Sequence, residues 1–469
     1  MVTSIVLNNI NIKLKVKNMA LRFFTGLLSS MIIALCFLSP AYSWSDHTLM
    51  SYGALSGTAE ISSEMPVPAR TLKTFLIKEQ KGIEELLESR EKWARENIPN
   101  YAPRPDELAF RAGKSADDIV ERFLKAIRIN PNAKMRLYVD LLPGESAAGR
   151  RVVKPGELTT LNRYDFMEQT VYLELRQGEM VSPLMVLCSA NNEPDYGFDL
   201  GLFEDNNTPF GAVYGFGIQP FGNPNLEYGS QAPFHMGFYH EAGIVFMAGP
   251  FLKQTYPEYR IDLFKTLSEY AFKSGQDYWG WRFMGWGMHY LGDLSMPYHA
   301  SVLPGVGTLR MIWINLKAML GFTESIDNAV QLVSNRHTVM EEFQSLMLRK
   351  AYNEKDKNHP FMMALANPID MIPYNDNFAR QVVAAESWEK GEIIDAVMEK
   401  YLPEKFISDP SFEASGSAEL NKIIELTQEH KGIEGVDKMT GSISDIFSSY
   451  SMHIRSYMLH ILKNSGKVL

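Results

Sequence analysis

The stretch GMHYLGDLSMPYHAS, residues 287–301, places two histidines and an aspartate within eleven residues of a chain that has only ten histidines. His289 and Asp293 are four positions apart, so on a helix they share one face. His299 follows Pro297, where a helix is expected to end or kink. These side chains therefore either make ordinary hydrogen bonds at a helix end or hold a metal ion.

Helical patterns extend outward from this stretch over most of the chain. Apolar residues recur at helical spacing in 72–96 and 115–129, and the second segment opens with a serine suited to an N-cap. Strand-like alternation is scarce. The sequence therefore predicts a mainly helical, all-α fold, with further helices over residues 262–275, 278–294, 311–333, 337–351, 378–400 and 442–463.

Two irregular tracts interrupt the helical patterns. Residues 143–160 are typical of an exposed loop, whereas 194–234 are rich in glycine, proline and aromatic residues. Long ordered loops are often functional. No internal repeat and no clear second domain is found, so we expect 44–469 to form a single domain, with 52–190 as a candidate extra helical layer.

The N-terminus has the pattern of a secretory signal peptide. Four basic residues precede the apolar run at 23–38, and SPAYS (39–43) supplies a helix breaker and small residues for cleavage. A retained membrane anchor is the rival interpretation, but the apolar run is short for one. We expect 1–43 to be removed, with translation starting at Met1 or Met19, and the protein to be secreted or periplasmic.

Charge and cysteine content narrow the function classes. The formal net charge is −9, and removal of residues 1–43 takes away four basic and no acidic residues, leaving −13. This negative net charge and the lack of a dense basic run argue against electrostatic binding of nucleic acid. Cys36 would leave with the signal, and Cys188 alone can form no intramolecular disulfide. Stability must then come from the core and from bound metal.

Further histidines and carboxylates accompany the opening stretch. Each has an ordinary explanation, such as a local hydrogen bond at i and i+4, a turn aspartate or a core histidine. Together, however, imidazole and carboxylate groups suit zinc, and they exceed the needs of one ion, so a metal cluster is predicted. Neighbouring ions bridged by a carboxylate suit the hydrolysis of phosphate esters. The additional candidates are His47, Asp195, Asp199, His235, His240, Glu241, His337 and Glu341.

The ordered set of motifs resembles a known family. HYLGDLSMPYHAS (289–301) is similar to the H-Y-x-G-D-x-x-x-P-x-H core of the bacterial zinc-dependent phospholipase C family, and more distantly to the related fungal single-strand nucleases. A tryptophan followed soon by a histidine, then PDY (194–196), a PxH (233–235) and a later HxxxE (337–341) occur in the family's order. The resemblance is strongest in 278–301.

This resemblance implies an all-α fold and a site for three zinc ions. Asp195 would also be the general base that orients a water molecule. The ligands carried over are Asp195, His235, His289 and Asp293 for one ion; Asp293, His47 and the amine and carbonyl of Trp44 for the second; and His299, His337 and Glu341 for the third.

Three departures from the family pattern leave alternatives open. The separation of Asp195 from His235 is longer than expected, so Asp199 is an alternative ligand, and His240 competes with His235. Residues 302–335 form an apolar insertion. No C-terminal β lipid-binding domain is evident.

The sequence thus leads us to expect a secreted zinc-dependent phosphodiester hydrolase. A phospholipase C that releases diacylglycerol and a phosphorylated head group is the first expectation, with a phospholipid membrane surface or lipid aggregate as substrate and neither nucleic acid nor a protein partner. The alternatives are a zinc-dependent nuclease or nucleotidase, or a non-catalytic zinc- or lipid-binding protein.

Overall fold

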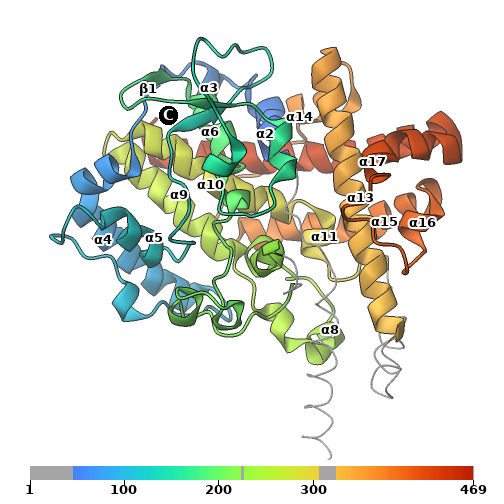
Figure 1. The fold of residues 1–469 in the computed structure, drawn as a ribbon, viewed down its shortest axis with the longest axis horizontal. Helices are drawn as coiled ribbons and strands as arrows, with labels where there is room; N and C mark the ends of the chain where they lie inside the picture. Colours follow the sequence, from blue (N-terminus) through green and yellow to red (C-terminus); the bar gives the residue numbers. More distant parts are fainter. Residues whose placement is uncertain (1–45, 223–226, 306–323, 468–469) are drawn as a thin grey trace, which may run out of the picture.

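The computed structural model describes residues 46–222, 227–305 and 324–467. The expected signal peptide, the candidate ligand Trp44 and most of the apolar insertion at 302–335 lie outside the described residues. Within them, helices dominate and strands are short, which confirms the predicted all-α class (Figure 1). No helix of this described part is both long enough and apolar enough to cross a membrane.

The helices fall close to the ranges that the periodicity predicts. The expected helices at 72–96, 262–275 and 278–294 correspond to α4, α9 and α10. The bounds are α2 His47–Leu55, α3 Ala59–Ser62, α4 Leu72–Asn97, α5 Ile119–Ala126, α6 Pro183–Ala190, α7 Ala232–His235, α8 Gly243–Ala248, α9 Pro257–Lys273, α10 Asp277–Leu294, α11 Pro297–Ala300, α13 Glu324–Glu354, α14 Pro360–Ala366, α15 Ala384–Tyr401, α16 Glu404–Ile407 and α17 Ile423–Asn464.

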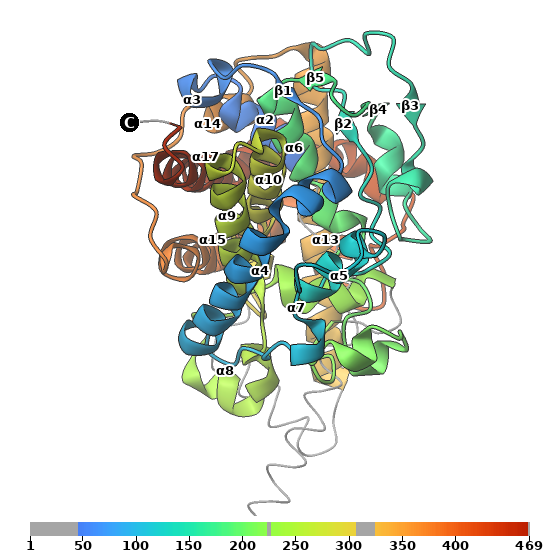
Figure 2. The same cartoon turned by 90° about the vertical axis from the view of Figure 1, so that its left-hand side faces the viewer.

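Helix α10 forms the centre of the molecule. Every residue from Tyr278 to Leu294 is buried, and α6, α9 and α17 pack against it (Figures 1 and 2). Gly285 permits the close approach of α6, since a Cβ there would lie 2.5 Å from the Leu187 carbonyl oxygen. Neighbours on several sides therefore fix the helix that carries His289 and Asp293.

Short antiparallel strands supplement the helices between residues 52 and 190. One sheet pairs β1 with β5, and the other has the order β2-β4-β3. In the second sheet Val139 pairs with Leu173, and in the first Val67 pairs with Val181. This segment, the candidate helical layer, thus combines α4 and α5 with two small sheets. The strand bounds are β1 Val67–Pro68, β2 Tyr138–Asp140, β3 Val152–Val153, β4 Tyr172–Glu174 and β5 Met180–Val181.

Two long helices complete the architecture. Helix α13 includes the predicted range 337–351 and α17 includes 442–463. Gly432 interrupts the helical geometry of α17 with φ 68° and ψ −168°, a conformation that glycine adopts without strain. The described part of the irregular tract 194–234 includes several short 3-10 helices. One of them, Glu193–Tyr196, begins just before the tract and carries Asp195.

Candidate metal centre

Helix α10 presents His289 and Asp293 on one buried face, as their spacing predicts. His289 Nε2 lies 3.3 Å from Asp293 Oδ2, and neither side chain is exposed to solvent. His289 Nδ1 is 2.8 Å from the carbonyl oxygen of Asn191, which follows α6. That hydrogen bond requires a proton on Nδ1, so Nε2 faces the carboxylates with its lone pair.

The structure assembles eight of the sequence-derived candidates into three neighbouring groups. In each group the donor atoms lie within 4.8 Å of one another, close enough to hold a metal ion. The residues come from α2, α7, α10, α11, α13 and the 3-10 turn at 193–196, so segments far apart in sequence meet here. The groups are His47, Asp195 and His289; His235, His289 and Asp293; and His299, His337 and Glu341.

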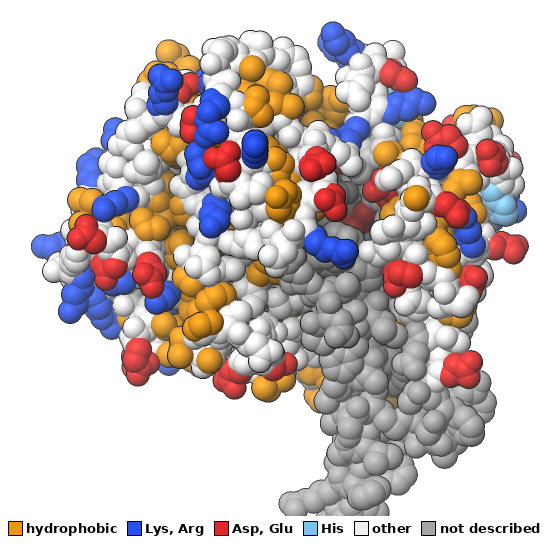
Figure 3. All heavy atoms as spheres, viewed as in Figure 1, with side chains coloured by type: hydrophobic (Ala, Val, Ile, Leu, Met, Phe, Trp, Pro, Cys, Tyr) orange, Lys and Arg blue, Asp and Glu red, His pale blue; other side chains and the backbone are white. Residues whose placement is uncertain are grey.

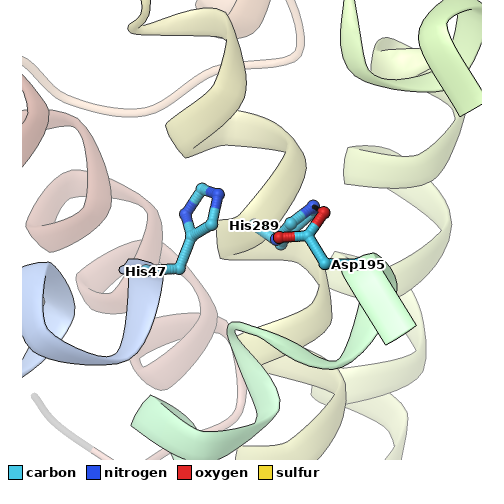
Figure 4. Close-up of side chains that lie close together, drawn as sticks. All are labelled: His47, Asp195 and His289. Carbon is cyan, nitrogen blue, oxygen red and sulfur yellow. Dashed lines mark ion pairs between the residues drawn. The ribbon is translucent and has the colours of Figure 1, made fainter. Parts of the chain in front are cut away.

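The first group joins three different parts of the chain. Figure 4 shows His47, Asp195 and His289 arranged around a common space, and they come from α2, the 3-10 turn and α10. His289 Nε2 lies 3.5 Å from Asp195 Oδ1, and the rings of His47 and His289 have centroids 4.3 Å apart. Two imidazoles and one carboxylate are a donor set that zinc accepts.

Asp293 lies between the groups. Its Oδ1 is 3.2 Å from His47 Nε2 and 3.7 Å from His299 Nδ1, while its Oδ2 is 2.7 Å from His235 Nδ1. The two oxygens therefore face different histidines. A carboxylate placed in this way is suited to bridge two ions.

The third group is built on α13. His337 and Glu341 lie one turn apart, with His337 Nε2 3.0 Å from Glu341 Oε1, and His299 Nε2 is 3.9 Å from the same oxygen. Tyr298 stacks on the His337 ring at a centroid distance of 5.5 Å and donates a hydrogen bond to Asp395 Oδ1 at 2.7 Å. This stacking fixes the orientation of the imidazole.

Burial keeps the third group in its neutral forms. It lowers the pKa of His299 to about 3 and that of His337 to about 4, and it raises the pKa of Glu341 well above its usual value. Within the described residues neither ring nitrogen of His299 has a hydrogen-bond partner, although the ring is fully buried. Buried polar atoms are normally satisfied, so a cation at these nitrogens fits the donor set.

His235 differs from the histidines of the third group, because its surroundings favour the protonated form of the ring. Although burial opposes protonation, Asp293 and Asp199 raise its pKa to about 10. Asp199 stays ionised because, against the effect of burial, Arg260 and His235 lower its pKa. In the absence of metal, His235 is therefore the cation that balances these carboxylates.

The alternatives to Asp195 and His235 occupy other positions. Asp199 lies outside the three groups, and its oxygens contact Arg260 and Tyr290. His240 Nε2 donates to the carbonyl oxygen of Arg380 at 2.7 Å. Glu241 accepts a hydrogen bond from the backbone N–H of Val302 at 2.7 Å, which gives this carboxylate a structural role.

Residues that the sequence does not single out as candidate ligands also shape the site. Asn191 acts through its backbone carbonyl, while Arg260 and Tyr290 act through Asp199. Nothing in their sequence surroundings indicates these contacts. Only the packing of α9 and α10 against the irregular tract brings them together.

Comparison of the chain with protein-family models, curated proteins and solved structures gave no match. The three groups of potential ligands are therefore the basis for inferring function. Their imidazole nitrogens and carboxylate oxygens could hold a metal ion.

Proposed function

We propose that this protein is a zinc-dependent phosphodiester hydrolase. The observation that carries the proposal is the convergence of three His/carboxylate groups around one buried aspartate, Asp293. The ligand sets we propose are those implied by the resemblance to the zinc-dependent phospholipase C family. They place His47 with Asp293 and Trp44 at one ion, whereas the geometric grouping places His47 with Asp195 and His289. Trp44 lies outside the described residues. Residues 1–43 would direct export and be removed.

The chain's own groups divide into ligands and a base. Zinc bound here would polarise phosphoryl oxygens and lower the pKa of water. Asp195 is the most exposed of the eight candidates, with 14% of its side chain accessible, whereas Glu341 has 6% and Asp293 none. Among these eight side chains, Asp195 is therefore the one most open to water. We assign it the role of accepting a proton from the attacking water on its carboxylate.

Phospholipid is the substrate class we favour. The family resemblance implies cleavage to diacylglycerol and a phosphorylated head group. Removal of residues 1–43 leaves a formal charge of −13, which disfavours polyanionic nucleic acid. On the face in Figure 3, basic side chains are interspersed with acidic ones rather than gathered into a basic tract. A nuclease or nucleotidase is the alternative.

The test combines metal analysis with a substrate comparison. We expect purified mature protein to contain zinc and to hydrolyse phosphatidylcholine vesicles faster than single-stranded DNA. Asp195→Asn should keep its fold and abolish turnover, while Asp262→Asn, a buried aspartate paired with Lys265 and Arg90, should keep turnover. Preference for DNA would indicate the nuclease branch. Zinc binding without either activity would indicate a non-catalytic zinc- or lipid-binding protein.

A further inference from the structure

The two ring nitrogens of His235 face different surroundings. Nδ1 points into the metal centre, 2.7 Å from Asp293 Oδ2 and 3.2 Å from His289 Nε2. Nε2 points away, 3.4 Å from Asp199 Oδ2. If His235 binds metal it must therefore do so through Nδ1, with its proton on Nε2.

Asp199 is held in place by a buried network. Arg260 contacts Asp199 Oδ1 through Nη2 at 2.5 Å and Nε at 3.1 Å, and Tyr290 donates to Oδ2 at 2.6 Å. Neither Asp199 nor Arg260 is exposed. Arg260 in turn donates to the carbonyl oxygens of Ile127 and Arg128, both at 2.7 Å, directly after α5. Both charges are thus fixed by groups outside the metal centre.

The same arginine also packs beside His235. Its guanidinium lies over the ring of Phe234, 4.8 Å from the centroid, and Phe234 precedes His235 in α7. Arg260 thereby restrains both the carboxylate and the helix that carries the imidazole. A carboxylate whose only function was to neutralise Arg260 would not need to face His235.

From this geometry we infer that Asp199 is a positioning residue that selects the tautomer of His235. An ionised carboxylate only accepts hydrogen bonds, so it keeps the proton on Nε2 and directs the Nδ1 lone pair at the metal. The inference rests on the proposed metal centre. The two nearby aspartates then have different roles. Asp195 belongs to the metal centre, whereas Asp199 contacts the ligand His235 on the side that faces away from the metal.

The variant Asp199→Asn tests this assignment because Arg260 has only donors. The amide oxygen must face Arg260, which turns the NH2 group toward His235 Nε2 and the Tyr290 hydroxyl. Nε2 then has to accept a hydrogen bond, so it gives up its proton and the neutral ring keeps the proton on Nδ1. That proton points at Asp293 and occupies the position of the proposed metal bond.

Two measurements follow from this reasoning. Nuclear magnetic resonance of the full-length mature protein with ¹⁵N-labelled histidines, metal-free, reports which ring nitrogen is protonated, and His235→Gln assigns the signal. In the metal-free wild type we expect protons on both ring nitrogens of the His235 cation, whereas in Asp199→Asn we expect Nε2 to be unprotonated and Nδ1 alone to carry a proton. Competition with a chelator should show the zinc Kd rising by about 10- to 100-fold in Asp199→Asn. Asp262→Asn is the matched control and should keep the wild-type Kd.

The possible outcomes are distinguishable. If Nε2 of His235 stays protonated in Asp199→Asn and the zinc content falls, Asp199 is a ligand and the inference is overturned. Unchanged protonation of Nε2 with an unchanged Kd would overturn it too. A wild type that binds no zinc would refute the proposed metal centre, whereas the tautomer measurement would still test the positioning role.

If Asp199→Asn does not fold, Tyr290→Phe removes one hydrogen bond and keeps the ion pair. It should raise the Kd by a smaller factor, and a Kd equal to that of the wild type would overturn the inference.

Discussion

Asp293 is the residue on which the candidate site depends most. Its two oxygens face His47 and His235 at 3.2 and 2.7 Å, whereas Glu341 lies 3.0 Å from His337 and 3.9 Å from His299, both in the third group. We predict that Asp293→Ala loses more zinc per chain than Glu341→Ala, loses all turnover and has the lower melting temperature, because bound metal stabilises only the folded state.

Zinc content and thermal unfolding of both variants, measured side by side, check this prediction. Asp262→Asn serves as the control for removing a buried aspartate elsewhere. A full complement of zinc in Asp293→Ala would contradict the cluster.

At this scale the sequence predicts some contacts and not others. His289 with Asp293, and His337 with Glu341, follow from helical spacing alone, because one turn of a helix brings i and i+4 together. The choice between Asp195 and Asp199 does not follow in this way. Both aspartates lie in an irregular tract, and Asp199 accepts a hydrogen bond from Arg260 of α9, which is distant in sequence.

At the scale of elements, contact between α10 and α6 depends on glycine. A Cβ at Gly285 would lie 2.5 Å from a backbone oxygen of α6, which cannot move without displacing that helix. Gly441, in the exposed part of α17, has nothing within 4 Å of an added Cβ. We predict that Gly285→Ala lowers the free energy of unfolding by about 1–3 kcal/mol through overpacking.

The matched change, Gly441→Ala, should raise the free energy of unfolding by about 0.5–1 kcal/mol, since alanine restricts the unfolded chain more than glycine does. Urea unfolding of the two variants measures both effects. Unchanged stability in Gly285→Ala would show that the approach of α6 to α10 does not require Gly285.

A second inter-element contact is sensitive to pH. Asp140 in β2 has its Oδ2 2.7 Å from Thr48 Oγ1 in α2, and Thr48 Oγ1 is 3.0 Å from the Cys188 carbonyl oxygen in α6. Burial raises the pKa of Asp140 from 3.8 to about 8. The protonated carboxyl can then donate to Thr48, which donates to Cys188.

The sign of the pH effect follows from this raised pKa. Between pH 3.8 and about 8 the folded protein holds a proton that the unfolded chain has released. This carboxyl's contribution to the free energy of unfolding is therefore complete below pH 3.8 and falls by about 1.4 kcal/mol per pH unit across that window. Asp140→Asn keeps a neutral donor at the same place. In zinc-free protein we predict a smaller loss of stability for the variant between about pH 5.5 and 7.5, and equal losses would contradict the assignment.

At the scale of the whole molecule, the sequence predicts where the helices lie along the chain better than how they pack around the candidate centre. Periodicity gives the ranges of α4, α9 and α10 because each depends on neighbours a few positions away. The short strands β3 and β5 have two residues each, too few for a periodic signal. The assembly of the candidate centre depends on contacts between residues as distant as His47 and Asp293, which no local pattern contains.

That long-range assembly links metal binding to global stability. The candidate ligands extend from His47 in α2 to Glu341 in α13, and α10 connects them through the buried core. An ion that binds only the folded arrangement adds RT ln(1 + [L]/Kd), about 2.7 kcal/mol per site when free zinc is 100 times Kd. We therefore predict that chelation lowers the melting temperature and the urea midpoint of the whole molecule in one transition. The measurement is calorimetry with and without chelator, followed by zinc add-back, which should restore the first value. Magnesium at equal concentration is the control, since it prefers oxygen ligands in octahedral geometry. If zinc removal leaves both midpoints unchanged, the three groups do not hold zinc in the folded protein.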